Sequence, residues 1–125
     1  MDIKILIADD NEETLGALSR LLANYDLVAA SDGKSARELA ASERPDLVLL
    51  DVEMPGLNGI DVLKGMLSLP RKPLVIMITA DGSRETIEKA LSLGVFAYIT
   101  KPFEKDDILG QVGRAITFIE NRGGD

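Results

Sequence analysis

The chain has 125 residues, which suits a single domain, and 46% of them are apolar, enough to fill a core without disulfides or metal staples. Acidic residues outnumber basic ones by 21 to 14, and the net charge of −7 argues against direct binding to nucleic acid or an anionic membrane, since both need a basic surface. Cysteine and histidine are absent, which excludes disulfides, thiol catalysis, serine–histidine catalysis and metal sites built on those side chains.

Short apolar runs alternate with segments of helical periodicity along the chain. Most runs are rich in Val, Ile and Leu, and several are apolar at consecutive positions, as expected of strands covered on both faces. The predicted strands are residues 3–8, 27–30, 47–52, 74–79 and 95–99. The apolar stripes that predict helices after them are Leu15/Leu18/Leu22, Ala36/Leu39/Ala40 in a weaker helix over 34–42, Ile60/Leu63/Leu67, Ile87/Ala90/Leu91 and Ile108/Val112/Ala115/Ile119.

The ends of the helical segments carry the residues that usually mark helix boundaries. Asn11, Asn58 and Ser83 are predicted N-caps, and Gly94 stands where a helix would end. The last helix has acidic residues in its first turn, where they suit the helix dipole: Asp106 and Asp107. The resulting (βα)₅ pattern predicts an α/β fold with a doubly wound parallel sheet, right-handed crossovers and helices on both faces.

One domain is expected over residues 1–121, followed by a tail or the start of a linker over residues 122–125. No apolar run approaches the roughly 20 residues of a membrane span. The first four residues lack the charged-then-apolar pattern of a signal peptide. We therefore expect a cytoplasmic protein that does not contact a membrane.

Polar side chains follow four of the five predicted strands. Asp9 and Asp10 follow the first strand, and Asp51 lies at the end of the third, closely followed by Glu53. Thr79 ends the fourth strand, and Lys101 follows the fifth. Most of them have an ordinary alternative role. Asp9 or Asp10 could cap a helix, and Asp51 could form a turn. Thr79 could be a plain strand residue and Lys101 a surface charge. In an open parallel sheet, however, ligands bind beyond the carboxyl ends of the strands, so these groups are expected to converge.

Converging carboxylates repel one another, and a fold tolerates them mainly where a cation or a function requires it. Oxygen ligands of this kind suit Mg²⁺ or Ca²⁺, and two or three carboxylates with waters suit octahedral Mg²⁺. A lysine and a threonine are not needed to bind a metal, but they make sense if an anion also arrives. A carboxylate nucleophile, a divalent metal and a lysine are the parts needed to transfer a phosphoryl group to an aspartate.

Four motifs carry a family resemblance: ILIADDN at residues 5–11, LLDVEMPG at 49–56, MITA at 77–80 and YITKPF at 98–103. On these motifs the chain resembles the receiver domain of two-component response regulators over residues 3–121. The resemblance implies the flavodoxin-like receiver fold with strand order 2-1-3-4-5. It also implies a protein that catalyses only its own phosphorylation and dephosphorylation.

The resemblance assigns Asp51 as the phosphoacceptor, which would form an acyl phosphate. Asp10 and Asp51 would coordinate Mg²⁺, or Mn²⁺ as a substitute, through carboxylates, and Glu53 through its backbone carbonyl, while Asp9 would act through a water. Lys101 would pair with Asp51 at rest and with a phosphoryl oxygen afterwards. The Lys101–Pro102 bond is usually cis in the family.

On the phosphoryl side, the resemblance assigns hydrogen bonds from the Thr79 hydroxyl and from the backbone amides of Glu53 and Ala80. Thr79 would move to meet the phosphoryl group, and Tyr98 would turn inward to fill the space behind it, although Tyr98 has an ordinary alternative as a half-buried strand aromatic. This movement would switch the face formed by the fourth helix, the fifth strand and the fifth helix. Two acidic residues are expected to tune the lifetime of the phosphoryl group: Glu53 and Asp81.

The resemblance implies a histidine kinase or a phosphotransfer protein as phosphodonor, docked near the first helix and the loop after the fifth strand, with Leu15 and Leu18 as candidate contacts that core packing explains equally well. A downstream target or an attached effector domain would receive the signal, and a phosphorylation-dependent homodimer is a further option. The domain itself is expected to bind neither nucleic acid nor membrane.

Three other functions compete with this interpretation. A haloacid-dehalogenase-type phosphatase also uses Asp, Mg²⁺, Thr and Lys, but its nucleophile follows the first strand and it needs a cap for which this chain is short. A flavin carrier would place its phosphate in the loop after the first strand, but residues 1–13 contain five acidic residues and one lysine and would repel that phosphate. A phosphorylation-independent receiver-like interaction module is the third, and the full set of site residues argues against it.

Overall fold

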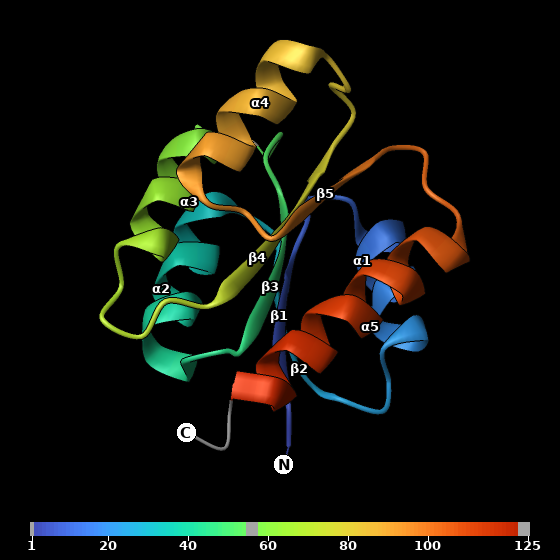
Figure 1. Ribbon diagram of the computed structural model, residues 1–125. Helices are drawn as coiled ribbons and strands as arrows, with labels where there is room; N and C mark the ends of the chain where they lie inside the picture. The colour runs from blue at the N-terminus through green and yellow to red at the C-terminus, as the bar shows by residue number, and fades with distance from the viewer. Residues whose placement is uncertain (1, 55–57, 123–125) are drawn as a thin grey trace.

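The computed structural model describes residues 2–54 and 58–122 and contains five strands and five helices among them (Figure 1). The strands are β1 (Lys4–Ala8), β2 (Asp26–Ala30), β3 (Leu47–Asp51), β4 (Leu74–Thr79) and β5 (Ala97–Thr100). The helices are α1 (Glu12–Leu21), α2 (Gly33–Glu43), α3 (Gly59–Leu67), α4 (Arg84–Leu93) and α5 (Lys105–Arg122).

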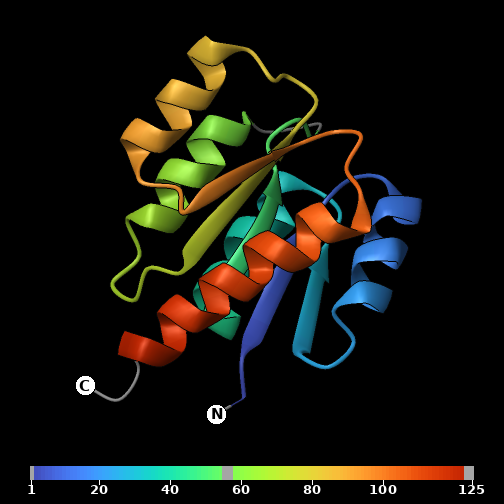
Figure 2. The same cartoon turned by 45° about the vertical axis from the view of Figure 1, so that its right-hand side comes forward.

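The strands form one parallel sheet in the order β2-β1-β3-β4-β5, which confirms the predicted α/β fold and strand order. Helices α2, α3 and α4 cover one face of this sheet, and α1 and α5 cover the other, as the two views show (Figures 1 and 2). Because all strands run the same way, the loops that follow β1, β3, β4 and β5 meet at one edge of the sheet.

Two hydrophobic cores lie on opposite faces of the sheet, and successive residues of a strand alternate between them. In β1, Ile5 and Ile7 face the core under α1 and α5, whereas Leu6 and Ala8 face the core under α2, α3 and α4. The central strand β3 divides in the same way and is buried throughout. This double burial explains the apolar residues at consecutive positions in the sequence.

The predicted helix boundaries agree closely with the structure. The side chains of Asn11, Asn58 and Ser83 accept hydrogen bonds from the first turns of α1, α3 and α4, which confirms all three predicted N-caps. Gly94 ends α4 with a φ of 105°, a left-handed conformation that favours glycine. The sequence analysis missed Asp32, which caps α2 by accepting from the Ser35 amide at 2.7 Å.

The fifth strand begins at Ala97, two residues later than predicted. The apolar Val95 looked like strand, but its amide donates to the Ala90 carbonyl at 3.3 Å and so belongs to the end of α4. Helix α5 runs to Arg122, one residue past the predicted end of the domain, and residues 123–125 lie outside the described residues. Within the described part of the chain, no helix combines the length and the apolarity needed to cross a bilayer.

Gly59, the first residue of α3, lets the loop after β3 pack closely against that helix. A Cβ built at this position would lie 2.0 Å from the carbonyl oxygen of Val52, so only glycine fits there. The amide of Val52 donates to the Ile78 carbonyl at 3.1 Å, which ties the same residue to β4. The backbone that follows Asp51 is therefore held from two sides.

Candidate functional site

Three carboxylates meet at the carboxyl edge of the sheet. Asp9 follows β1 and Asp51 ends β3, and because these strands are neighbours their side chains come together. Asp9 and Asp51 are 0% and 2% exposed, respectively, whereas Asp10 is exposed. One carboxylate oxygen from each of the three residues lies within 4.8 Å of the others. The convergence inferred from the strand ends is therefore present.

Lys101 bridges the two buried carboxylates from the other side of the site. Its Nζ donates to Asp9 Oδ2 at 2.9 Å and to Asp51 Oδ2 at 3.1 Å. Its amide donates to the Thr79 carbonyl at 2.8 Å, and the Lys101–Pro102 peptide bond is cis. The contact with Asp51 is the one that the family resemblance implies for the resting protein.

Burial and hydrogen bonding shift the pKa values of Asp9 and Lys101. Burial raises the pKa of Asp9, and the hydrogen bonds from the Asn11 amide and from Lys101 offset only part of this effect. Burial by itself would lower the pKa of Lys101, but hydrogen bonds to Asp9 and Asp51 outweigh it and raise that pKa. Lys101 therefore stays cationic, and among the described residues it is the cation that pairs with this cluster. Its single positive charge is outnumbered by three carboxylic side chains, and their oxygen donors suit a divalent cation such as Mg²⁺.

Glu53 links the loop after β3 to the loop after β4. Its Oε1 accepts from the Thr79 hydroxyl at 2.8 Å and also from the backbone amide of Ala80. Thr79 is fully buried, and its Oγ1 in turn accepts from the Asp81 amide at 2.9 Å. The sequence analysis placed the charge of Glu53 beside the site but did not foresee this contact, which joins residues 26 positions apart.

The backbone of Glu53 also lies in the site. Its amide donates to Asp51 Oδ1 at 2.9 Å and so fixes one oxygen of that carboxylate. Pro55 and Gly56, the last two residues of the motif around Asp51, lie outside the described residues.

Asp81 faces away from this group, although the sequence analysis placed it at the border of the site. Its carboxylate accepts from the Ser83 amide at 2.9 Å and from the Thr86 hydroxyl at 2.7 Å. The Thr86 hydroxyl and the Ser83 amide hold the pKa of Asp81 below its ordinary value. The Asp81 side chain therefore binds the start of α4. Any effect of Asp81 on a bound phosphoryl group has to act from a greater distance than an effect of Glu53.

Tyr98 lies at the surface of β5, with 38% of its area exposed. Together with Asp107 and Gln111 of α5 it lines a shallow hollow. Tyr98 therefore does not have the inward orientation that the resemblance implies for the phosphorylated protein. The other exposed large apolar side chains among the described residues are Leu91, Leu109 and Phe118, all on α4 or α5.

A hollow adjoins the site between α1 and the loop after β5. Its lining consists of Asn11, Glu13, Thr14, Ala17, Ala80, Lys101, Pro102 and Phe103. The prediction that Leu18 is a docking contact is wrong, because Leu18 is fully buried in the core under α1 and α5. Leu15 is partly buried and packs against the same core.

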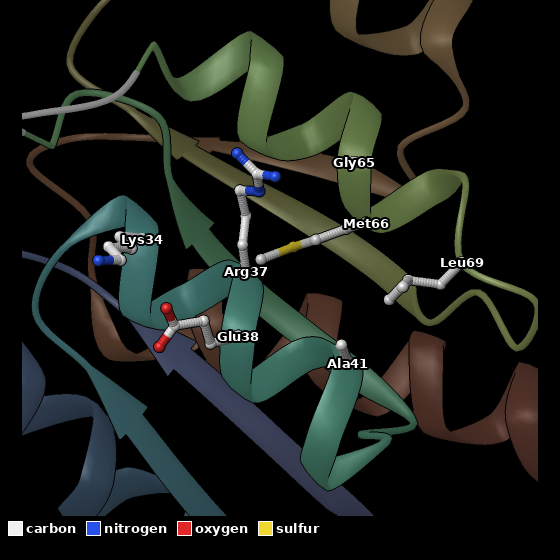
Figure 3. A pocket seen from close by; sticks show the side chains of 7 residues that line it. All are labelled: Lys34, Arg37, Glu38, Ala41, Gly65, Met66 and Leu69. Carbon is white, nitrogen blue, oxygen red and sulfur yellow. The ribbon is translucent and has the colours of Figure 1, made fainter.

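A separate hollow lies between α2 and α3, where Arg37 extends across the gap beside Met66 (Figure 3). A Cβ at Gly65 would lie 3.8 Å from Arg37 Nε, an ordinary van der Waals distance, so this hollow does not require a glycine there. This hollow contains none of the residues to which the sequence analysis assigned chemistry, so the candidate functional site is the edge of the sheet formed by Asp9, Asp51 and Lys101.

Comparison with known protein families gives one clear match. The family described as the response regulator receiver domain matches residues 5–113 of this chain. Among characterised proteins, the sporulation initiation phosphotransferase F of Bacillus subtilis (strain 168) is 35% identical over 123 residues, which are 97% of this chain and 99% of that protein. The regulatory protein AtoC of Escherichia coli (strain K12) is 38% identical over 115 residues, which are 90% of this chain but 25% of that protein.

Solved structures agree with these matches. A response regulator receiver domain protein (CheY-like) from Methanospirillum hungatei JF-1 superposes with a TM-score of 0.90 at 26% identity, covering 97% of this chain and 98% of that one. The CheX–CheY–BeF₃–Mg²⁺ complex from Borrelia burgdorferi includes a chain that superposes with a TM-score of 0.85 at 27% identity, covering 91% of this chain and 89% of that one.

Proposed function

Because the chain belongs to the family of response regulator receiver domains, we propose that it accepts a phosphoryl group on Asp51 from a histidine kinase or a phosphotransfer protein, with Mg²⁺ as its cofactor. The observation that carries this proposal is the bridge from Lys101 to Asp9 and Asp51 within a cluster of three carboxylates. The protein catalyses its own phosphorylation and dephosphorylation and acts on no other substrate. It works in the cytoplasm, where such phosphodonors present their phosphoryl groups.

In the proposed reaction, a carboxylate oxygen of Asp51 attacks the phosphorus of phosphohistidine or of a small acyl phosphate. The bond from phosphorus to the donor nitrogen or oxygen breaks, its electron pair leaves with the donor, and an acyl phosphate forms on Asp51. The amide of Glu53 orients the Asp51 carboxylate at rest through its 2.9 Å hydrogen bond to Oδ1. Lys101, which stays cationic, balances the charge that develops on the transferred oxygens.

Asp10 and Asp51 would hold the metal through carboxylates and Glu53 through its backbone carbonyl, with Asp9 acting through a water. The excess negative charge and the oxygen-only donors of the cluster fit Mg²⁺, and Mn²⁺ is a reasonable substitute. When bound, the metal supplies the positive charge that lets an anionic donor approach three carboxylates. The solved relative that contains BeF₃ and Mg²⁺ supports this assignment.

The phosphoryl oxygens that Lys101 does not bind need donors on the opposite side of the site. The Thr79 hydroxyl and the amides of Ala80 and Glu53 are the groups we assign to them. Thr79 is buried, so a change in its partner is transmitted into the core rather than lost in solvent. We propose that this change draws Tyr98 inward from its exposed position and so alters the surface of α4, β5 and α5, which a target protein, an attached effector domain or a second copy of the chain then reads.

The phosphodonor is proposed to dock on the hollow between α1 and the loop after β5. This hollow includes Lys101 itself and the apolar surface of Ala17 and Phe103. A histidine side chain that enters there reaches the side of the site where Lys101 meets Asp51. The exposed Glu13 and the half-buried Thr14 of α1 are the contacts we expect to select the donor.

Intact-mass measurement after incubation with acetyl phosphate tests the proposal. With Mg²⁺ we expect a gain of about 80 Da, one phosphoryl group, and no gain without Mg²⁺ or in Asp51→Asn. No gain in the wild-type protein, with Mg²⁺ and either acetyl phosphate or a phosphorylated histidine-containing donor, would contradict the proposal and favour a phosphorylation-independent interaction module.

A further inference from the structure

The Glu53 carboxylate occupies two of the three donors that the proposed function assigns to the phosphoryl group. Its Oε1 accepts from both the Thr79 hydroxyl and the Ala80 amide. Building on the proposed function, we infer that the Glu53 carboxylate is an internal competitor of the phosphoryl group: it fills the anion-binding half of the site in the unphosphorylated protein and leaves when Asp51 is phosphorylated. This gives Glu53 a defined position and a defined act, beyond the general expectation that it tunes the phosphoryl lifetime.

The competition follows from the chemistry of the two donors. A hydroxyl and an amide that point at one oxygen form a small oxyanion pocket, and a carboxylate oxygen fills it as a phosphoryl oxygen would. Each of these donors has one hydrogen, so neither can serve Glu53 and a phosphoryl oxygen in full at the same time. Phosphorylation therefore has to break the contacts to Glu53 before it gains its own.

Glu53 is the member of this pair that can leave. Glu53 is exposed and lies in the loop after β3, so water can hydrate its carboxylate when the side chain leaves Thr79 and Ala80. Thr79 is fully buried in the last position of β4, and Ala80 contributes only a backbone amide. The exchange thus requires the exposed Glu53 side chain to move out, which makes the Thr79 hydroxyl and the Ala80 amide available to the arriving phosphoryl group.

The contact with Glu53 also separates two events that the proposed switch joins: hydrogen bonding of the Thr79 hydroxyl to an anion and the inward turn of Tyr98. In this structure an anion already engages the Thr79 hydroxyl, whereas Tyr98 remains exposed. Engaging Thr79 is therefore not sufficient to turn Tyr98 inward. The contact with Glu53 keeps the Thr79 hydroxyl hydrogen-bonded in the absence of phosphate, so the switch depends on which anion is bound and not simply on whether one is.

A general repulsion between Glu53 and an incoming phosphoryl group would also slow phosphorylation, and side-chain length separates the two explanations. Glu53→Asp keeps the charge but withdraws the carboxylate by one methylene, so that it no longer reaches both donors. Occupancy predicts that Glu53→Asp behaves like Glu53→Ala, whereas repulsion predicts that it behaves like the wild-type protein. Glu38→Ala removes the same charge from an exposed glutamate of α2 and is the matched control.

The experiment combines three measurements on the wild-type protein, the two Glu53 variants and the control. The first is the amide proton shift of Ala80 in the metal-free protein, which we expect to move upfield in both Glu53 variants and to stay unchanged in Glu38→Ala. The second is the Kd for beryllofluoride in the presence of Mg²⁺, and the third is the rate of Asp51 phosphorylation by acetyl phosphate. Both Glu53 variants should bind beryllofluoride about tenfold more tightly and be phosphorylated about tenfold faster, since tenfold is the change expected for a difference of about 1.4 kcal/mol.

Two outcomes overturn the inference in distinguishable ways. If Asp51 is phosphorylated but Glu53→Asp matches the wild-type protein in all three measurements, the competitor role is wrong and the proposed function stands. If none of the proteins binds beryllofluoride or gains a phosphoryl group with Mg²⁺ present, the proposed function fails and the competitor role fails with it.

Discussion

The loops that follow β3 and β4 each place an acidic residue two positions after the polar residue that ends the strand, namely Glu53 after Asp51 and Asp81 after Thr79. Glu53 reaches across to the other loop and holds Thr79 and Ala80. Asp81 is held by its own loop and helix, through the Ser83 amide and the Thr86 hydroxyl. Equal spacing in the sequence therefore gives different partners. The short side chain of Asp81 is met by an amide and a hydroxyl from the start of α4, whereas among the described residues the longer side chain of Glu53 is met by donors from the loop after β4.

The two loops differ in the groups that they present to the candidate site. The loop after β3 presents a carboxylate to the site, while the loop after β4 presents a hydroxyl and an amide and turns its own acid outward. A phosphoryl group that enters this site would meet the donors of the loop after β4 and, bound to them, the carboxylate of Glu53. Substitutions matched between the two loops therefore test how far the asymmetry governs phosphorylation.

The largest effect is expected from Thr79→Val, which removes the donor that both Glu53 and the phosphoryl group use. Loss of one donor to a developing oxyanion commonly costs about 100-fold to 1,000-fold in rate, and we expect a decrease of about 100-fold in Asp51 phosphorylation by acetyl phosphate. The time course of intact mass measures it. Thr86→Val makes the same change in α4, where it removes the hydroxyl that holds Asp81, and a comparable loss there would contradict the asymmetry.

Next in size is the effect of Gly59→Ala on stability. The added Cβ would meet the Val52 carbonyl oxygen at 2.0 Å, so the backbone after Asp51 has to shift, at a cost of about 2–3 kcal/mol. In the other loop, the Cβ of Gly82→Ala would meet only the Thr100 side chain, at 3.2 Å, and we expect less than half of that cost. Urea unfolding midpoints of the two variants give the comparison, and equal midpoints would show that the loop after β3 is not specially confined.

A smaller effect is expected from Asp9→Asn on the metal-free protein. Burial raises the pKa of Asp9, which means that the ionised carboxylate is unfavourable in the folded state, so its removal should raise the melting temperature by a few degrees. The same variant should gain less stability from added Mg²⁺ than the wild-type protein does. A lower melting temperature in Asp9→Asn would show that its hydrogen bonds to Lys101 and Asn11 outweigh the cost of burial.

Mg²⁺ itself should distinguish the two loops. Because the assigned ligands lie after β1 and β3, a Mg²⁺ titration should shift the amide resonances of Val52 and Glu53 and leave those of Ser83 and Thr86 nearly unchanged. The measurement is a set of two-dimensional amide spectra at increasing Mg²⁺. Equal shifts in both loops would argue that the metal acts on the whole edge of the sheet.

The smallest effect concerns pH and Asp81. The Thr86 hydroxyl and the Ser83 amide lower the pKa of Asp81 from its ordinary value of 3.8, so the carboxylate stabilises the fold above pH 3.8 and loses this contribution as the pH falls through the lower, folded-state value. Asp81→Asn should therefore have a slightly lower melting temperature at neutral pH, and the difference should vanish in strong acid. A difference that persists in strong acid would assign the stabilisation to a contact other than the ionised carboxylate.

Most of the fold and the composition of the site were predictable from the sequence because they depend on strong, repeated signals. Consecutive apolar residues marked the strands, capping side chains marked the helix starts, and parallel topology required Asp9, Asp51, Thr79 and Lys101 to meet at one edge. The orientation of single side chains was not predictable in this way. Glu53 and Asp81 have the same offset, and only the positions of donors from distant segments decide where each one points.

Two further differences have the same physical origin. Leu18 lies on the apolar stripe of α1, and a stripe does not show which of its members a partner could still reach; the structure buries Leu18 completely. Val95 is apolar like the strand that follows it, but the turn that closes α4 uses its amide, so β5 begins at Ala97.

The bridge from Lys101 to Asp9 joins residues separated by 92 positions, and it has a consequence for the order in which a new chain matures. During synthesis the acidic residues after β1 and β3 emerge long before the lysine that balances them. Under the proposed function, a nascent chain that stops short of β5 would contain the acceptor Asp51 but would lack Lys101, the cation assigned to the transfer. Under the proposed function, we therefore expect phosphotransfer to begin only after β5 and the lysine that follows it have been synthesised.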